Sequence, residues 1–237
     1  MRKHMTVLAA FLAAGVAMQV GRADDKKVGT LKGVVKYSGD MSKANKDDKT
    51  EKDVESCGKE RKKPDLLVDD ASKGLADAVV YVKKLDDKLV AFADAQKKVV
   101  MDQKSCAFDK HVTLLAAGGE LVMKNSDAVL HNVSFSSTNN GTFNQGIGAG
   151  KEQAKKFDKP EFITMACSVH PWMSALVVVM KQPYYAVTDA TGAFSLELPE
   201  GKHTILVQHQ TLGKADKKGL EIEIKAGETK TQDFEFK

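Results

Sequence analysis

The seven-residue segment from Cys167 to Met173 constrains the fold of this chain more than any other part of the sequence. It reads Cys-Ser-Val-His-Pro-Trp-Met, so a thiol, an imidazole and a thioether follow one another at intervals of three residues. A second imidazole, that of His131, precedes the cysteine by 36 residues. For these four side chains to converge, the segment must form one tight loop, and His131 must lie on a neighbouring strand.

Two histidines, one cysteine and a weak axial methionine are the ligand set of a blue (type 1) copper electron-transfer site. Sulfur ligands favour Cu(I) and imidazoles suit Cu(II), so the mixed set serves both oxidation states. Zinc is the main competing metal, but the thioether of Met173 argues against it. Each of the four residues taken alone is compatible with an ordinary core or strand-end position, and only their joint spacing and order favour copper.

The stretch from Lys110 to Met180 resembles the cupredoxins, the amicyanin- and plastocyanin-like blue copper proteins. The resemblance implies a Greek-key β-sandwich with one type 1 copper ion bound by His131, Cys167, His170 and Met173. The stretch before the cysteine, Ile163–Ala166, departs from the family, which usually has aromatic residues there. The matching features are the His-Val pair at His111, the Gly-Glu-Leu run at Gly119–Leu121, Asn125, Gly150–Gln153 and the whole Cys-x-x-His-Pro-aromatic-Met loop.

The same resemblance implies supporting roles for residues beside the ligands. Asn132 would tie the two ligand segments together by hydrogen bonding, with Ser168 following the cysteine as the second supporting residue. Pro171 and Trp172 would flank a solvent-facing His170 and form an exposed apolar rim where a redox partner protein docks. Packing of Trp172 in the core is the alternative.

Residues 1–23 are typical of a signal peptide, with Arg2 and Lys3 followed by an apolar stretch and a small residue at Ala23. We therefore expect a periplasmic or secreted protein cleaved near Ala23, with no stable membrane span afterwards; a retained N-terminal anchor is the alternative. The formal charge of +4 falls to +1 without this segment, which carries three basic residues and no acidic one. Nothing in the remaining composition indicates nucleic-acid binding.

Export to an oxidising compartment predicts a disulfide between Cys57 and Cys106, because Cys167 is already assigned to the metal. Such a bridge closes a loop of about 50 residues and adds a few kcal/mol of stability. Two unpaired thiols are the alternative.

Short apolar or alternating runs separated by Gly, Asp and Asn turns predict an all-β fold. Two stretches break the pattern. Met41–Lys63 has almost no apolar residue and is expected to be a solvated charged loop, and Ser136–Gly150 is expected to be a polar loop. The strands are predicted at Gly29–Tyr37, Ala78–Lys83, Lys98–Asp102, His111–Leu115, Glu120–Lys124, Asn132–Ser136, Phe162–Met165, Ala175–Met180, Tyr184–Thr188, Ala193–Leu198, His203–His209, Leu220–Ile224 and Thr231–Phe236.

The two ends of the chain carry a second resemblance. Near the C-terminus, three predicted strands are joined by two tight turns, at Asp189–Gly192 and Pro199–Gly201. This pattern is similar to that of the carboxypeptidase regulatory-like domains, which are transthyretin-like β-sandwiches. The first two strands of that pattern match Gly33–Val35 and Ala76–Val82, which precede the copper segment.

We therefore expect residues 28–97 and 182–237 to form the two halves of one regulatory-like sandwich, with the cupredoxin domain, residues 98–181, inserted between them. Neither flank has enough strands to close a core alone. A linear array of domains is the alternative.

The sequence leaves three functional hypotheses. The first is an exported one-electron carrier with an unidentified redox partner, the second a copper-handling protein without electron transfer, and the third a surface module that binds protein or carbohydrate and uses copper only for stability. No Ser-His-Asp order, P-loop or His-Glu-x-x-His motif is present, so an enzyme is not expected. His203 and His209 are expected at the surface or at strand ends.

Overall fold

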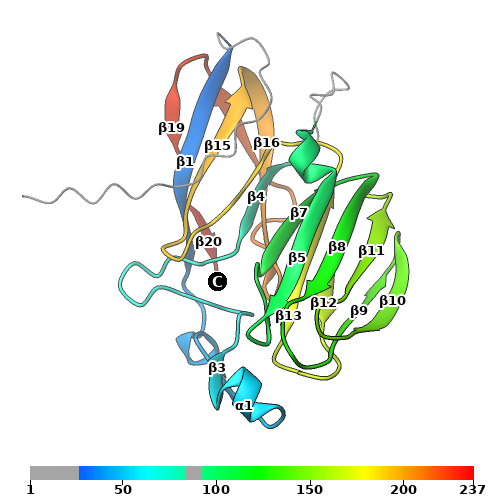
Figure 1. Ribbon diagram of the computed structural model, residues 1–237. Helices are drawn as coiled ribbons and strands as arrows, with labels where there is room; N and C mark the ends of the chain where they lie inside the picture. Colours follow the sequence, from blue (N-terminus) through cyan, green and yellow to red (C-terminus); the bar gives the residue numbers. More distant parts are fainter. Residues whose placement is uncertain (1–26, 84–91) are drawn as a thin grey trace, which may run out of the picture.

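The computed structural model describes residues 27–83 and 92–237. The expected signal peptide, residues 1–23, lies outside the described residues. Within them the chain is nearly all β, as the sequence predicts (Figure 1). No helix in the described part is both long enough and apolar enough to span a bilayer.

Two sheets that share a core form what we name the outer sandwich. In the first sheet, β1 lies between β15 and β19 and also pairs with β20. In the second sheet, β4 lies between β14 and β16. Strand β16 of the second sheet also pairs with β17 and β18. The bounds are β1 Val28–Tyr37, β4 Val79–Val82, β14 Tyr185–Val187, β15 Ala193–Pro199, β16 Gly201–His209, β17 Gly213–Lys214, β18 Leu220–Ile224, β19 Thr229–Thr231 and β20 Phe234–Phe236. The predicted strand Thr231–Phe236 is thus divided between β19 and β20.

The outer sandwich draws its strands from both ends of the chain. β1 pairs in register with β15 from Val28 to Val34, and β4 pairs with both β14 and β16. The shared core combines Leu31 and Val80 from the first part of the chain with Leu198 and Val207 from the last part. The insertion of residues 98–181 between two halves of one regulatory-like sandwich stays a prediction.

A second pair of sheets forms what we name the inner module. One sheet has the order β10-β9-β12-β13-β7 and the other β11-β8-β5-β6. Their shared core contains Met101, Leu121, Phe157 and Val177 together with Cys167. The bounds are β5 Lys98–Lys104, β6 Ala107–Phe108, β7 Val112–Ala116, β8 Gly119–Asn125, β9 His131–Ser137, β10 Gly141–Ile147, β11 Glu152–Phe157, β12 Glu161–Ala166 and β13 Ser174–Met180; a short 3₁₀ helix, η2, spans Asp94–Gln96 just before β5.

The sequence of β13 is an unbroken apolar run because both faces of this strand are buried. One face packs in the inner core through Ala175, Val177 and Val179. The other face, which includes Val178, packs with Val79 of β4 in a separate small cluster at the junction with the outer sandwich. A strand that is buried on both faces loses the alternation expected of a half-exposed one.

The predicted polar loop Ser136–Gly150 is wrong in its middle part. β10 covers Gly141–Ile147 and pairs antiparallel with β9 over seven residues. The strand lies at the edge of its sheet and most of its side chains are exposed, so no apolar alternation marks it in the sequence.

The predicted solvated loop Met41–Lys63 is also wrong in part, because it forms short elements. These lie below the inner module in Figure 1, and one of their residues, Cys57, is only 2% exposed. The composition conceals this order, since a single disulfide-bonded residue holds the segment in place rather than an apolar stripe. The elements are η1 Met41–Lys43, β2 Asp47–Lys49, α1 Val54–Cys57 and β3 Glu60–Lys62.

Candidate metal centre

The hairpin of β12 and β13 carries the ligand loop. Cys167 follows the end of β12, and Met173 precedes β13; the N–H of Cys167 donates to the carbonyl of Met173 at 3.2 Å. Within the loop, the N–H of Met173 donates to the carbonyl of His170 at 3.0 Å. The loop is therefore closed by its own backbone, which turns the side chains of Cys167 and His170 towards the same place.

His131 reaches this place from the neighbouring strand. It is the first residue of β9, and β9 pairs with β12 through Ser134 and Ala166, immediately before Cys167. The predicted condition that the remote histidine lies on an adjacent strand thus holds.

Three predicted ligands converge in the interior. Nδ1 of His131 lies 2.9 Å from Nδ1 of His170, and Sγ of Cys167 lies 3.9 Å from the same His170 nitrogen. The ligand atoms of all three lie within 4.8 Å of one another. Both imidazoles are fully buried, and Cys167 is 2% exposed. With metal–nitrogen bonds of about 2.0 Å and metal–sulfur bonds of about 2.3 Å, a nitrogen and a sulfur that bind one ion lie at most about 4.3 Å apart. The separations of 2.9 and 3.9 Å therefore suit one ion.

Each imidazole has a carboxylate on its other nitrogen, which sequence reasoning missed. Nε2 of His131 lies 2.8 Å from Oδ2 of Asp127, and Nε2 of His170 lies 2.9 Å from Oδ2 of Asp53. If both Nε2–H groups donate to these carboxylates, both Nδ1 atoms present lone pairs to each other. Facing lone pairs at 2.9 Å repel unless a proton or a cation lies between them, so the chemistry of the donor set fits a bound metal ion.

The sequence signals for the two carboxylates differ. Asp127 precedes His131 by four residues, so a search for acidic residues near the first histidine finds it. Asp53 lies 117 residues before its partner in a run of charged residues, and nothing local distinguishes it from its neighbours.

The thiol of Cys167 is held in a form suited to metal binding. The backbone N–H of Asn132 donates to Sγ at 3.3 Å. Burial raises the pKa of this thiol, but the interaction with His131 and the nearby backbone N–H groups outweigh it, so the pKa lies below its ordinary value. Since the thiolate is the ligand form, this environment favours metal binding.

The two histidines differ in their electrostatics. Burial lowers the pKa of His131, but the hydrogen bonds with Cys167 and Asp127 outweigh it, so the net pKa is raised. Burial lowers the pKa of His170 below its ordinary value in spite of the bond to Asp53.

The predicted supporting residues act through different groups. The side-chain oxygen of Asn132 accepts from the backbone N–H of Ser168 at 3.2 Å, and its amide donates to Oδ1 of Asn144 at 2.8 Å. Asn132 thus joins the β9 ligand segment to the loop after Cys167. Ser168 takes part through its backbone, while its hydroxyl lies 3.4 Å from that of Ser134.

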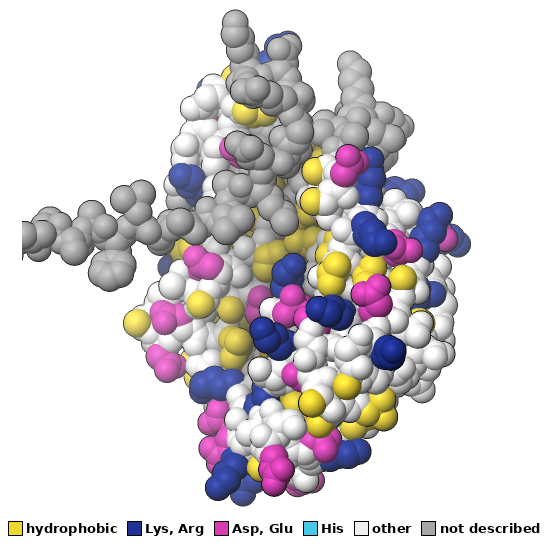
Figure 2. Space-filling view, in the orientation of Figure 1, with side chains coloured by type: hydrophobic (Ala, Val, Ile, Leu, Met, Phe, Trp, Pro, Cys, Tyr) yellow, Lys and Arg dark blue, Asp and Glu magenta, His cyan; other side chains and the backbone are white. Residues whose placement is uncertain are grey.

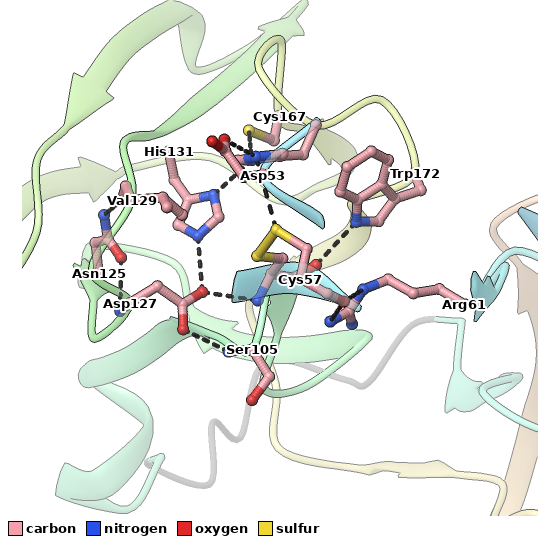
Figure 3. Close-up of a disulfide and its surroundings, with 12 residues drawn as sticks. Asp53, Cys57, Arg61, Ser105, Asn125, Asp127, Val129, His131, Cys167 and Trp172 are labelled. Atoms are coloured by element: carbon pink, nitrogen blue, oxygen red, sulfur yellow. Dashed lines mark hydrogen bonds and ion pairs between the residues drawn. A yellow bond between two sulfur atoms is a disulfide. The ribbon is translucent and has the colours of Figure 1, made fainter. Parts of the chain in front are cut away.

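Cys57 and Cys106 form a disulfide that lies against the site (Figure 3). Sγ of Cys57 is 3.9 Å from Nε2 of His170, and the carbonyl of Cys106 accepts the indole N–H of Trp172 at 3.0 Å. The sulfur atoms of this pair are committed to each other, which leaves Cys167 as the thiol of the site.

The expectation that Trp172 lies on an exposed docking rim beside a solvent-facing His170 is wrong. Trp172 is 8% exposed, its indole is hydrogen-bonded inside, and its ring lies 5.0 Å from that of His170. His170 is covered by Asp53 and by the disulfide. Pro171 is exposed, as expected.

Met173, the fourth predicted ligand, is 1% exposed and belongs to the same core cluster as Cys167. A small cavity of about 80 Å³ lies beside it, lined by Trp172, His111 and Arg61 among others. Its assignment as the axial ligand stays a prediction.

No protein-family model matches this chain, and no curated protein matches it either. Solved structures that resemble part of it include a reduced Cu(I) variant of amicyanin, with 17% identity, 43% of this chain and 98% of that chain covered, and a TM-score of 0.33. A purple cupredoxin from Nitrosopumilus maritimus matches with 20% identity, coverages of 35% and 98%, and a TM-score of 0.31. The copper-containing nitrite reductase of Thermus scotoductus matches with 18% identity, coverages of 43% and 25%, and a TM-score of 0.34.

At these identities and TM-scores the likenesses establish no relationship and no function for this chain. The geometry of the buried site is the basis on which we assign a function.

Proposed function

We propose that this chain is an exported type 1 copper protein that carries one electron at a time to or from a redox partner protein. The observation that supports the proposal is the convergence of Nδ1 of His131, Nδ1 of His170 and Sγ of Cys167 in one buried place. Two imidazoles and a thiolate belong to the donor set of such a site, and Met173 would be its fourth, weaker ligand.

When bound, the copper ion would supply a Cu(II)/Cu(I) couple that needs no covalent change in a substrate. The chain's own residues do the rest. The N–H of Asn132 stabilises negative charge on Cys167, and the enclosing sheets exclude water from the buried donors. A scaffold that holds the donors this firmly changes little between the two oxidation states.

Export is part of the proposal and is supported by the buried disulfide, which is at home in an oxidising compartment. The likeness of the outer sandwich to regulatory-like domains remains a proposal as well. We assign no catalytic residue to the chain.

The second candidate is a protein that binds copper without transferring electrons. The closure of His170 favours it, because no edge of this imidazole reaches solvent where a partner protein could dock. The rate of electron exchange between the copper protein and a small inorganic redox reagent distinguishes the two candidate functions. An electron carrier exchanges electrons rapidly in both directions, whereas a protein that only binds copper does not.

The direct test is a visible spectrum of the copper-loaded protein before and after reduction. We expect a Cys–copper charge-transfer band that gives a blue or green colour and bleaches on reduction, and Cys167→Ser should abolish it. Ser126→Ala, which changes a hydroxyl bonded to Asp102 in the same module, is a control that keeps the band. A colourless copper-loaded wild type that binds zinc tightly would overturn the proposal.

A further inference from the structure

The carboxylate of Asp53 is the contact between the segment before Cys57 and the metal centre. Its Oδ2 lies 2.9 Å from Nε2 of His170, which has no exposed surface, while its own side chain is 32% exposed. Asp53 therefore lies between the imidazole and solvent, and the part of its side chain that faces away from His170 is exposed.

Several features fix Asp53 in this place. It is the residue before α1, with a left-handed backbone at φ +51°, and its carbonyl accepts the N–H of Cys57 at 2.8 Å. Four residues on, the disulfide holds Cys57 to Cys106. The guanidinium of Arg61 donates to the carbonyl of Cys57 at 2.9 and 2.6 Å. A short helical turn that is pinned at its end thus carries the carboxylate.

Asp127 forms the equivalent support on the other imidazole. It accepts the N–H groups of Ser105 and Cys106 at 2.6 and 2.7 Å and contacts His131 at 2.8 Å. The disulfide therefore links the segments that hold the two carboxylates (Figure 3). Cys57 ends α1, the helical turn that follows Asp53, and the backbone N–H of Cys106 donates to Asp127.

We propose that Asp53 is a positioning residue of the metal centre. It holds His170 as the tautomer that carries its proton on Nε2, so that Nδ1 faces the metal, and its negative charge stabilises the more highly charged, oxidised metal. The proposal rests on the proposed copper function and adds that the long charged segment of the chain completes the site.

Three variants separate the hydrogen bond from the charge. Asp53→Asn keeps an oxygen that accepts the Nε2–H and tolerates a left-handed backbone, but removes the charge. Asp53→Gly tolerates the backbone and removes both. Glu55→Gln removes one negative charge from an exposed side chain of the same helical turn and is the matched control.

The first measurement is the ¹⁵N NMR spectrum of the histidines in the apoprotein and in the diamagnetic Cu(I) protein. We expect His170 of the wild type to carry its proton on Nε2, with slow exchange against solvent. Asp53→Asn and Glu55→Gln should keep this tautomer, and Asp53→Gly should lose the protected proton. A wild-type His170 protonated on Nδ1 alone in both forms would overturn the proposal.

The second measurement is made on the copper protein. Asp53→Gly should weaken copper binding roughly 10- to 100-fold in competition with a chelator, as loss of a group behind a metal ligand does. The reduction potential should rise in both Asp53 variants and change much less in Glu55→Gln. Equal effects in all three variants, or none, would contradict the positioning role.

The two proposals fail in different ways. If the wild type shows no charge-transfer band, the copper function is wrong, and the tautomer of His170 in the apoprotein still decides whether Asp53 positions it. If the band is present, Asp53→Gly keeps the protected Nε2 proton, and both Asp53 variants match Glu55→Gln in copper affinity and reduction potential, the copper function stands and the positioning role is wrong.

Discussion

The indole N–H of Trp172 donates to the carbonyl oxygen of Cys106 at 3.0 Å, inside the protein. The ligand loop is thereby tied to the disulfide, and through Cys57 to the charged segment that covers His170. Figure 2 shows dark blue and magenta side chains around this lower part of the molecule, among backbone and other side chains drawn in white. The residue that sequence resemblance assigns to partner docking is therefore a structural link.

Replacing Trp172 by Phe should lower the free energy of unfolding of the apoprotein by about 2 kcal/mol. The change leaves the buried carbonyl of Cys106 without its donor and removes part of a packed ring. Urea denaturation measures the effect. Leu130→Ala, at a side chain that is 54% exposed, is the control and should change stability by about 0.5 kcal/mol or less. Equal stability of Trp172→Phe and the wild type would contradict the link.

Removing the disulfide by the paired changes Cys57→Ala and Cys106→Ala should cost roughly 4 kcal/mol of stability, because the bridge closes a loop with a sequence separation of 49 residues. Copper affinity should fall in the same variant, since Asp53 loses its anchor. Mass spectrometry of a non-reduced digest checks the bridge itself, and two free thiols in protein from the export compartment would count against it.

Much of the fold can be predicted from the sequence because buried strands carry clear patterns. The apolar run of β13 and the spacing from Cys167 to Met173 identify the central hairpin and its loop, and the need for His131 to join these ligands places it on an adjacent strand. Edge strands such as β10 lack such a pattern, since exposed side chains put no constraint on hydrophobic periodicity.

The cover of the site could not be predicted for a different reason. Asp53 contacts His170 because a disulfide from Cys57 to the sequence-distant Cys106 holds a polar segment across the loop. A single carboxylate among many in that segment has no local signature. The cupredoxin resemblance implies a solvent-facing His170. In the structure Asp53 covers this imidazole, and His170 is fully buried.

The burial of His209 was not predicted either, because the sequence favours a surface or strand-end position for it. It is 1% exposed in β16, its Nδ1 accepts the N–H of Thr211 at 3.3 Å, and its buried Nε2 has no partner among the described residues. Burial first, and then the neighbouring His111, lower its pKa from 6.5 to about 4, whereas a backbone group at Ala76 and the charge of Asp65 oppose the shift.

This shift predicts acid sensitivity of the outer sandwich. The unfolded chain takes up a proton at His209 below about pH 6.5, whereas the folded chain does so only near pH 4, so stability falls as pH falls through this window. Between about pH 7.5 and about pH 5 the loss from this residue is about 2 kcal/mol. His209→Gln, which cannot titrate, should lose that much less over the same range in urea denaturation. Parallel pH profiles for the variant and the wild type would contradict the assignment.

The last prediction concerns the insertion of the inner module. The chain leaves the outer sandwich after β4 and returns before β14, and the N–H of Val82 donates to the carbonyl of Tyr184 at 3.1 Å. Because the two crossing points are adjacent, replacing Lys98–Lys181 by a short Gly/Ser linker should leave a protein that unfolds cooperatively as a β-sandwich and binds no copper.

Removing the inner module should also expose apolar side chains of the outer sandwich that it covers. Val79 packs against Leu176, Val178 and Met180 of β13, so removal of the inner module exposes an apolar face on β4. We expect the excised protein to self-associate, and Val79→Thr to reduce this association while the cooperative transition persists, as measured by sedimentation and by thermal unfolding. If residues 182–237 alone fold cooperatively, without β1 and β4, the two flanks are not halves of one sandwich and a linear array replaces the insertion.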